Sequence, residues 1–183
     1  MTLPIVLALG LLLGGAGSSD GGAHPSASGS VLPAITASAP PRTDAATVST
    51  CAQVISALPL TLDHQDLRRT ETQPASGQVQ AWGDPAIVFA CGVSRPEDLV
   101  PGSSVQYILG GNRAGPYYDV TPADGANVWT TVDRSIYISV TVPQKYQGGD
   151  VMPPISRAIA KVLPAVCTTG DDPDVSRLCT RRK

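Results

Sequence analysis

The stretch AWGDPAIVFACGV (residues 81–93) decides the fold that this sequence predicts. Its Trp-Gly-Asp-Pro start is typical of a turn, because an Asp before a Pro accepts a backbone N–H with its carboxylate. The apolar run that follows, residues 86–91, ends at a cysteine. Such a short unbroken run indicates a strand buried on both faces, although a buried helix fits the same pattern. We therefore expect a framework strand held at Cys91, and we favour Asp84 as a turn former over a catalytic base.

The sequence after this strand predicts further strands of an antiparallel sheet. Residues 128–132 and 136–142 form the clearest pair, joined at Asp133-Arg134-Ser135. In the second of them apolar and polar side chains alternate with a period of two, which indicates one buried face. Residues 104–109 and 117–121 flank a glycine-rich turn and are expected to pair in the same way. Together with the first strand they give a sheet of about four to five strands.

Two helices are predicted to bracket this sheet. Residues 50–58 follow a capping Ser49 or Thr50, and residues 154–163 place apolar side chains on one side. The polar segment 61–80 is expected to be mostly irregular, with residues 78–81 as a candidate start of a strand. This order predicts an α+β fold with the N- and C-terminal helices packed on one sheet face, and a small mixed α/β sheet is the alternative.

The N-terminal residues differ in composition from the rest of the chain. Residues 1–17 contain an apolar run as long as the core of a secretory signal and shorter than a bilayer span, and Arg42 is the first basic residue. Residues 18–49 are rich in Gly, Ala, Ser, Thr and Pro, which predicts a disordered linker. Residues 50–183 are then a single α+β domain, preceded by a cleaved signal peptide or a membrane anchor.

Composition excludes some classes of function. A chain of 183 residues allows one domain with extensions rather than two full domains. The formal net charge of −2, with 15% charged residues, is unlike that of a generic nucleic-acid binder. We therefore expect no nucleic-acid partner.

Four cysteines in a chain with an export-like leader predict disulfides. Cys51, Cys91, Cys167 and Cys179 allow three pairings, of which we favour Cys51–Cys91 and Cys167–Cys179 because each joins an element to its expected neighbour. The first bond closes the longer loop and would contribute about 4 kcal/mol in the chain-entropy model. No two cysteines have the C-x₂-C spacing of zinc or thioredoxin-type sites, so we expect no metal and no cofactor.

Five side chains are candidates for a ligand site: Trp82, Asp84, Arg95, Trp129 and Arg134. Tryptophans line sugar and aromatic sites, but beside strands they more often pack in the core. Two guanidinium groups could bind a phosphate or carboxylate, with solvated or structural arginines as the alternative. Asp133 and Arg134 are expected at the surface of a hairpin turn, where an ion pair contributes little.

No catalytic motif is evident. The sequence lacks Gly-x-Ser-x-Gly, Ser-x-x-Lys and His-Glu-x-x-His. The GGNRAG segment (residues 110–115) lacks the Lys-Ser/Thr of a phosphate loop, and His64 with Asp66 has no nucleophile assigned to it. A non-enzymatic role is therefore favoured over an enzyme.

Three segments resemble a known family. They are residues 81–93 with Arg95-Pro96, Cys51 with Leu58-Pro59, and VWTTVDRSIYISVTVP (residues 128–143). They are similar to actinobacterial envelope proteins classed as a domain of unknown function, and the similarity extends over residues 51–163. The resemblance implies an extracytoplasmic protein with an N-terminal membrane or signal segment, and it implies no activity.

We therefore expect an exported cell-envelope protein, secreted or anchored to the membrane, that is an accessory or binding module. Another envelope or membrane protein is the expected partner, and the membrane itself if residues 1–17 are retained. An enzyme or ligand-binding protein with a cleft around Asp84, Arg95 and Arg134 is the alternative.

Overall fold

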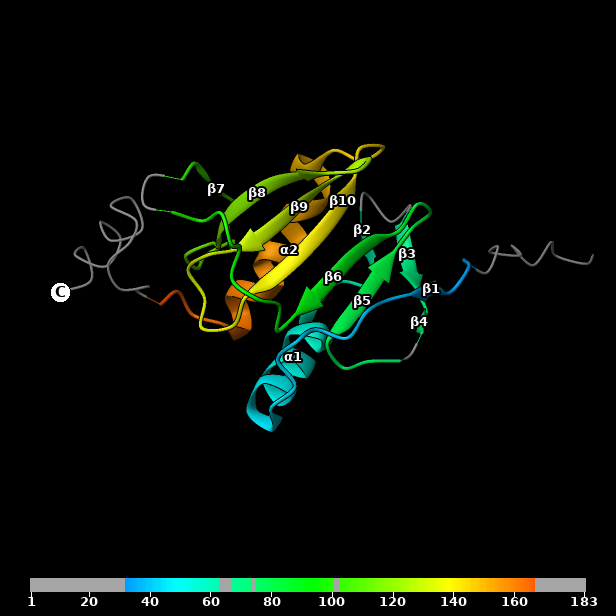
Figure 1. Ribbon diagram of the computed structural model, residues 1–183, viewed down its shortest axis with the longest axis horizontal. Helices are drawn as coiled ribbons and strands as arrows, with labels where there is room; N and C mark the ends of the chain where they lie inside the picture. The colour runs from blue at the N-terminus through cyan, green and yellow to red at the C-terminus, as the bar shows by residue number, and fades with distance from the viewer. Residues whose placement is uncertain (1–31, 63–66, 74, 101–102, 167–183) are drawn as a thin grey trace, which may run out of the picture. The chain divides into compact units, whose positions relative to one another are not determined.

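The computed structural model describes residues 32–62, 67–73, 75–100 and 103–166 of the chain (Figure 1). Two helices occur in these residues, α1 (Ala45–Ala57) and α2 (Gly148–Val162). The strands are β1 (Ile35–Thr36), β2 (Thr61–Leu62), β3 (Leu67–Thr70), β4 (Thr72–Gln73), β5 (Val79–Trp82), β6 (Ile87–Cys91), β7 (Val105–Tyr107), β8 (Tyr117–Ala123), β9 (Ala126–Thr131) and β10 (Ile138–Pro143).

Eight of these strands form one antiparallel sheet, in the order β2-β3-β5-β6-β10-β9-β8-β7. The strands β1 and β4 form a separate parallel pair. The predicted α+β class is confirmed, and the sheet has more strands than the expected four to five. The additional strands come mainly from the segment 61–80, for which an irregular structure was expected.

The strand predicted from the apolar run is β6, near the middle of the sheet. Ile87, Phe89 and Cys91 are fully buried, whereas Val88 and Ala90 are half-buried. Phe89 lies opposite Val140 of β10, so the alternating residues of β10 continue the same buried face. One face of β6 is therefore more completely covered than the other, whereas the sequence predicted that both faces are buried.

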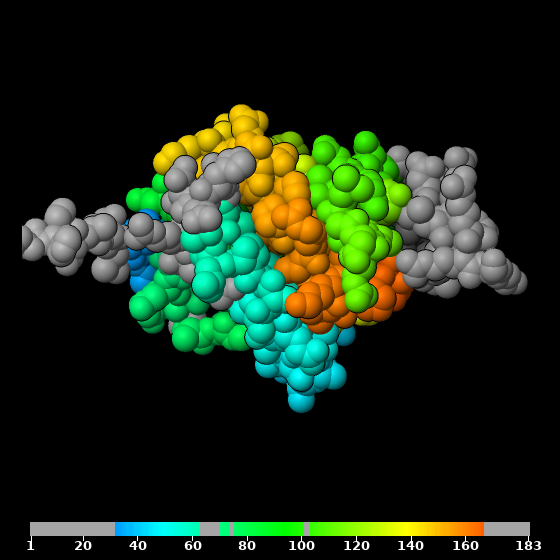
Figure 2. Space-filling model, turned by 180° about the vertical axis from the view of Figure 1, so that it is seen from behind, coloured from blue at the N-terminus to red at the C-terminus, as the bar shows by residue number. Residues whose placement is uncertain are grey.

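Both helices pack on the face that contains Phe89 and Val140. The buried core joins residues from both helices and from the central strands, including Val54, Trp82, Phe89, Tyr118, Trp129, Val140, Met152, Ile155 and Ile159. Figure 2 shows this side of the molecule, with α2 in orange and α1 in cyan. Neither helix of the described residues is long and apolar enough to cross a membrane.

The first helix begins earlier than predicted. It starts at Ala45, and Asp44 is its N-cap, because the Asp44 carboxylate accepts a hydrogen bond from the Thr47 amide at 2.9 Å. Thr50, a predicted cap, lies inside the helix and donates its hydroxyl to the Ala46 carbonyl. The pattern misled the prediction because Asp44 is followed by Ala-Ala-Thr, whose small side chains show no apolar periodicity.

The second helix also begins before its predicted start at residue 154. Its first residue is Gly148, so Pro153 and Pro154 lie in the second turn. A proline lacks the N–H that would bond to the carbonyl four residues earlier, which is why the sequence favoured a later start. The apolar side that was expected is present, with Ile155 and Ile159 fully buried.

The predicted linker, residues 18–49, contains regular structure in its described part. Its described part, residues 32–49, contains β1 and the first residues of α1. Ile35 donates its amide to the Glu71 carbonyl at 3.0 Å, and Ala37 donates to the Gln73 carbonyl at 3.1 Å. This pairing uses the backbone alone, so the composition does not reveal it. Residues 1–31, with the predicted signal segment, lie outside the described residues.

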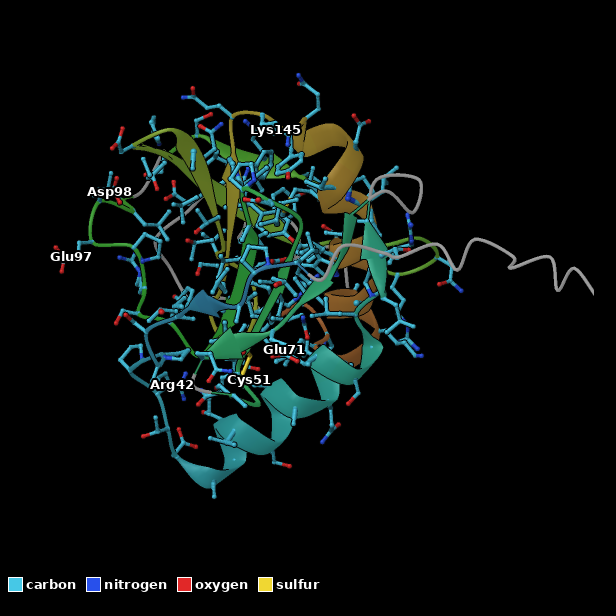
Figure 3. All side chains as sticks on the ribbon, turned by 90° about the vertical axis from the view of Figure 1, so that its right-hand side faces the viewer. Arg42, Cys51, Glu71, Glu97, Asp98 and Lys145 are labelled. Atoms are coloured by element: carbon cyan, nitrogen blue, oxygen red, sulfur yellow. A yellow bond between two sulfur atoms is a disulfide. The ribbon has the colours of Figure 1, made fainter. Side chains whose placement is uncertain are left out.

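Two segments lie on the face of the sheet that points away from α2. They are residues 32–44, which lead into α1, and residues 92–100, which leave β6. Figure 3 shows this arrangement from the side, with Arg42 in the first segment and Glu97 and Asp98 in the second. The second face of the sheet is thus covered by chain segments rather than by a helix layer.

Candidate functional site

Both candidate tryptophans belong to the core. Trp82 is fully buried, and its indole Nε1 donates to the Pro59 carbonyl at 3.1 Å. Trp129 is 9% exposed and packs edge-on against Tyr118, with ring centroids 5.9 Å apart. The space above the Trp129 ring is closed by Gly148, where an added Cβ would lie 2.6 Å from the ring. These aromatic faces are therefore covered by protein.

Asp84 and Arg95 are exposed and contact different neighbours. The Asp84 carbonyl accepts a hydrogen bond from Lys145 Nζ at 2.9 Å, which links the turn before β6 to the segment after β10. Arg95 donates to the carbonyl of the adjacent Pro96 at 3.4 Å. The acceptor for Lys145 is therefore the backbone oxygen of Asp84 and not its carboxylate.

Asp133 and Arg134 are buried, and the prediction that they lie at the surface is wrong. Their exposed fractions are 2% and 1%. Arg134 Nη1 lies 2.6 Å from Asp133 Oδ2, and Arg134 Nη2 donates to the Ala114 carbonyl at 2.9 Å. The other carboxylate oxygen, Oδ1, accepts the Tyr117 amide at 3.0 Å. The pair thereby joins the β9–β10 connection to the segment before β8.

Burial and pairing shift the pKa of the Asp133 carboxyl in opposite directions. Burial raises the pKa of the Asp133 carboxyl, and the Arg134 guanidinium and the Tyr117 amide partly offset that rise. The guanidinium itself keeps one nitrogen, Nε, buried without an acceptor. Because its Nη groups already bond to Asp133 and Ala114, Arg134 is a structural arginine in this fold.

The residues on either side of the Asp133–Ser135 turn indicate in the sequence that the turn is buried. Val132 and Ile136, on either side of the Asp133–Ser135 turn, are both apolar, and both are buried. Burial of the two flanking apolar residues brings the turn between them toward the core. Charged groups in such a turn are costly to bury unless they are paired. In the described residues no hydrogen bond or ion pair joins any two of Asp84, Arg95 and Arg134.

A second set of contacts surrounds the predicted disulfide. Cys51 of α1 and Cys91 of β6 are bonded, with their Cα atoms 5.7 Å apart, as the sequence predicted (Figure 3). Gln78, which is 5% exposed, donates its side-chain Nε2 to the Arg42 carbonyl at 2.7 Å and to the Cys91 carbonyl at 3.1 Å. The residues 167 and 179 of the other predicted disulfide lie outside the described residues.

These contacts fasten the segment before α1 to the end of β6. The Arg42 amide donates to the Gly92 carbonyl at 3.1 Å, and Gln78 returns to the Arg42 carbonyl. Gly92 has a φ of +90°, and a Cβ there would lie 2.8 Å from Gln78 Nε2, so only glycine fits without strain. Sequence reasoning did not single out Gln78, because a polar residue before a strand carries no distinctive signal.

An open pocket lies between α1 and the strands β3 to β5. Its volume is about 450 Å³, within the range of small-molecule sites. Five of its lining residues have hydroxyl or amide side chains: Thr70, Thr72, Gln73, Ser76 and Gln80. Ile55 and Val79 add apolar surface, and Glu71 adds a carboxylate (Figure 3). This lining suits a polar neutral or cationic group rather than an anion.

Few potential ligands for a metal ion or a cofactor lie together in the described part of the chain. No three side chains of the His, Cys, Asp or Glu type gather there in a way that would hold a metal ion. Burial raises the pKa of the Asp119 carboxyl, and the negative charge of Asp98 raises it further.

Comparison with known proteins gives one match. The model of a family described as a protein of unknown function (DUF3515) matches residues 1–168. No curated protein and no solved structure matches the chain.

Proposed function

This chain belongs to the DUF3515 family, and we propose that it is an exported, non-enzymatic binding module of the cell envelope. In this proposal residues 1–17 direct export and either anchor the chain in the membrane or are removed. The bound partner is another envelope or membrane protein. The resemblance to actinobacterial envelope proteins supports this location.

The observation on which the proposal depends is the Cys51–Cys91 disulfide. Disulfides form and persist in oxidising environments and are rare in the cytosol, where thiols are kept reduced. Both cysteines are fully buried in the core, so the bond is part of the framework. A buried bond of this kind is expected of a domain that folds outside the cytoplasm.

The contacts of the reactive side chains support a non-enzymatic role. Arg134 and Asp133 neutralise one another inside the protein. The buried hydroxyl of Ser156 is hydrogen-bonded to the Tyr118 hydroxyl at 2.9 Å. Its partner in the described part of the chain is thus a phenol rather than the imidazole or amine base that activates a nucleophilic serine. An enzyme with Asp84, Arg95 and Arg134 in one cleft gains no support from these contacts.

The pocket beside α1 is the surface that we assign to binding. Its polar wall includes backbone-paired strands on one side and α1 on the other, so it is held by rigid elements. Thr70 is fixed there because its hydroxyl donates to the Pro33 carbonyl at 2.7 Å. The partner contributes a polar neutral or cationic group to this pocket.

Export is tested by the redox state of the cysteines in intact cells. Acid-quenched cells expressing the tagged full chain are treated with a mass-adding maleimide, with and without prior reduction. The Cys51→Ser variant provides the control, because it frees Cys91. We expect no modification of Cys51 and Cys91 before reduction. In a second assay, protease added to cells without their outer wall should digest the chain. Two reduced thiols in a protease-protected chain would contradict export.

Binding is tested by a photocrosslinking amino acid placed at Gln73 in the pocket, with Asp124 of the β8–β9 turn as the control position. The expected product is one defined envelope protein crosslinked from Gln73 and absent from Asp124. Substituting Gln80→Ala should lower the yield, because its amide lies in the wall. Equal products from both positions would exclude the pocket as the binding site, and would leave the export result unaffected.

A further inference from the structure

Three exposed cationic side chains belong to α2 and to a turn that packs against it. Arg157 and Lys161 lie four positions apart in α2, so they project from the same side of the helix. Arg113 lies in the turn of residues 110–113, which is closed by a bridge between Gly110 and Arg113. All three side chains are exposed, and we call them the basic patch.

Close approaches of the backbone place this turn against α2. A Cβ on Gly110 would lie 2.9 Å from the Cβ of Ala160. A Cβ on Gly111 would lie 3.4 Å from Cδ and 3.6 Å from Cγ of Arg157, so the aliphatic stem of Arg157 runs beside the turn. Figure 2 shows the turn, in green, next to α2 in orange. The turn that carries Arg113 therefore lies against the helix that carries the other two cations.

The basic patch is not neutralised within the described residues. The ion pair found there joins Asp133 to Arg134, and none of the three cations takes part in one. The helix α2 has one acidic residue, Asp150, which lies in its first turn, about two turns before Arg157. Like charges four positions apart on a helix repel one another. A negatively charged surface would remove that repulsion, so the patch is complementary to an anionic partner.

An exposed apolar side chain lies at the start of the same turn. Leu109 immediately precedes Gly110, and 68% of it is exposed, whereas the neighbouring Ile108 packs against the core. Tyr107 is 43% exposed, and its hydroxyl accepts the Gly115 amide at 3.1 Å, which holds the ring in place. Leucine and tyrosine beside lysine and arginine are the residue types of membrane interfaces.

We propose that the basic patch and Leu109 dock the domain on an anionic membrane surface. The cationic groups bind lipid phosphates, and Leu109 enters the boundary between headgroups and acyl chains. A soluble acidic partner would match the charges but would leave Leu109 in water, so the bilayer fits the surface better. The docking is weak and reversible, and it weakens as the salt concentration rises. This inference uses none of the residues of the pocket beside α1 and stands apart from the proposed function.

The test is flotation of the purified full chain with vesicles of two compositions. One is phosphatidylcholine alone, and the other contains about one third phosphatidylglycerol, which is negatively charged. Residues 1–17 contain an apolar run that can insert into either vesicle. The measured quantity is therefore the ratio of the partition coefficient for anionic vesicles to that for neutral ones.

Two double variants of equal net charge are compared. Arg157→Gln with Lys161→Gln removes two cations of the basic patch. Arg42→Gln with Arg95→Gln is the matched control, because it removes two exposed cations from the segments on the opposite face of the sheet (Figure 3). Leu109→Ser tests the apolar contact. All five side chains are exposed, so the melting temperatures should stay close to that of the wild type and show that each variant folds.

We expect the double variant of the patch to lower the ratio about 25-fold, which is about fivefold for each cation. The control should keep the wild-type ratio, and Leu109→Ser should lower it about five- to tenfold. Equal ratios for the two double variants would overturn the proposal, and so would a Leu109→Ser variant that binds like the wild type. A wild type without preference for anionic vesicles would also overturn it, and binding to soluble polyglutamate would then assign the patch to an acidic protein.

Discussion

Gln78 and Cys91 are hydrogen-bonded to each other twice. The Cys91 amide donates to the Gln78 carbonyl at 2.9 Å, and Gln78 Nε2 donates to the Cys91 carbonyl at 3.1 Å. The same Nε2 group also holds the Arg42 carbonyl. One buried amide therefore joins the start of β5, the disulfide and the segment that enters α1.

Replacing this amide should destabilise the domain. In Gln78→Ala the carbonyls of Arg42 and Cys91 lose their donor, and an unsatisfied buried group costs about 1–3 kcal/mol. Urea unfolding should show this loss with the m-value unchanged. Gln73→Ala is the control, because Gln73 is exposed, and it should stay within about 0.5 kcal/mol of the wild type. Equal effects of the two substitutions would contradict the role assigned to Gln78.

The buried ion pair predicts a larger effect from removing one partner. Arg134→Met leaves Asp133 buried without its cation, and breaking such a pair costs about 3–5 kcal/mol. The exposed Arg113→Met serves as the control and should have little effect. Denaturant unfolding measures both.

A double variant separates charge from packing. Asp133→Leu combined with Arg134→Met removes both charges, and it should recover a large part of the stability lost in Arg134→Met. If the double variant is instead less stable than Arg134→Met, the unpaired charge of Asp133 is not the cause of the stability lost in Arg134→Met.

Glycine is required at position 92. Gly92→Ala introduces a Cβ at a φ of +90° and within 3.0 Å of the Arg42 carbonyl oxygen. Gly125→Ala is a matched control, because its φ of +65° is also positive, and a Cβ there meets nothing within 4 Å. We expect Gly92→Ala to be less stable than Gly125→Ala by about 1–3 kcal/mol, the usual cost of overpacking. Thermal melts of the two variants decide this, and equal melting temperatures would exclude the predicted clash.

The Asp44 cap predicts a dependence on pH. Hydrogen bonds from Thr47 lower the pKa of the Asp44 carboxyl from its ordinary value of 3.8. Since the folded pKa is the lower one, the cap stabilises the fold above the ordinary pKa, and this contribution is lost as the pH falls through the folded pKa. Asp44→Ala should therefore lower the melting temperature at neutral pH and approach the wild type in acid.

The control for this series is Asp124→Ala, an exposed acid in the β8–β9 turn. Its difference from the wild type should be small at every pH. A difference for Asp44→Ala that is constant across the acid range would mean that Asp44 acts through its shape and not through its charge.

Several features were predictable because they depend on local patterns. The strand at residues 86–91 and the alternation at 136–142 arise from side chains within one segment, so a single sequence displays them. Cys51 and Cys91 were predicted as partners because their bond joins the first helix to its expected neighbouring strand. In contrast, β1 and β4 pair through backbone atoms in polar segments, and no side-chain pattern marks them.

The candidate site shows the same division. The sequence identifies Asp84, Arg95 and Arg134 as charged residues but not the distances between them. In the fold each of the three contacts different neighbours. The pocket beside α1 depends on segments distant in the chain. It could not be inferred from spacing, because spacing does not record which segments pack side by side.

The sequence by itself indicated the α+β class and the central strands and favoured the Cys51–Cys91 pairing among three, since hydrophobic burial and cysteine placement act through residue type and order. Only the tertiary structure decided that Arg134 is buried with Asp133, that Gln78 joins three segments, and that Oδ2 of Asp119 is buried without a hydrogen-bond partner. The physical reason is that the energy of a charged or polar group depends on burial and on nearby groups, and these are set only when the chain is packed.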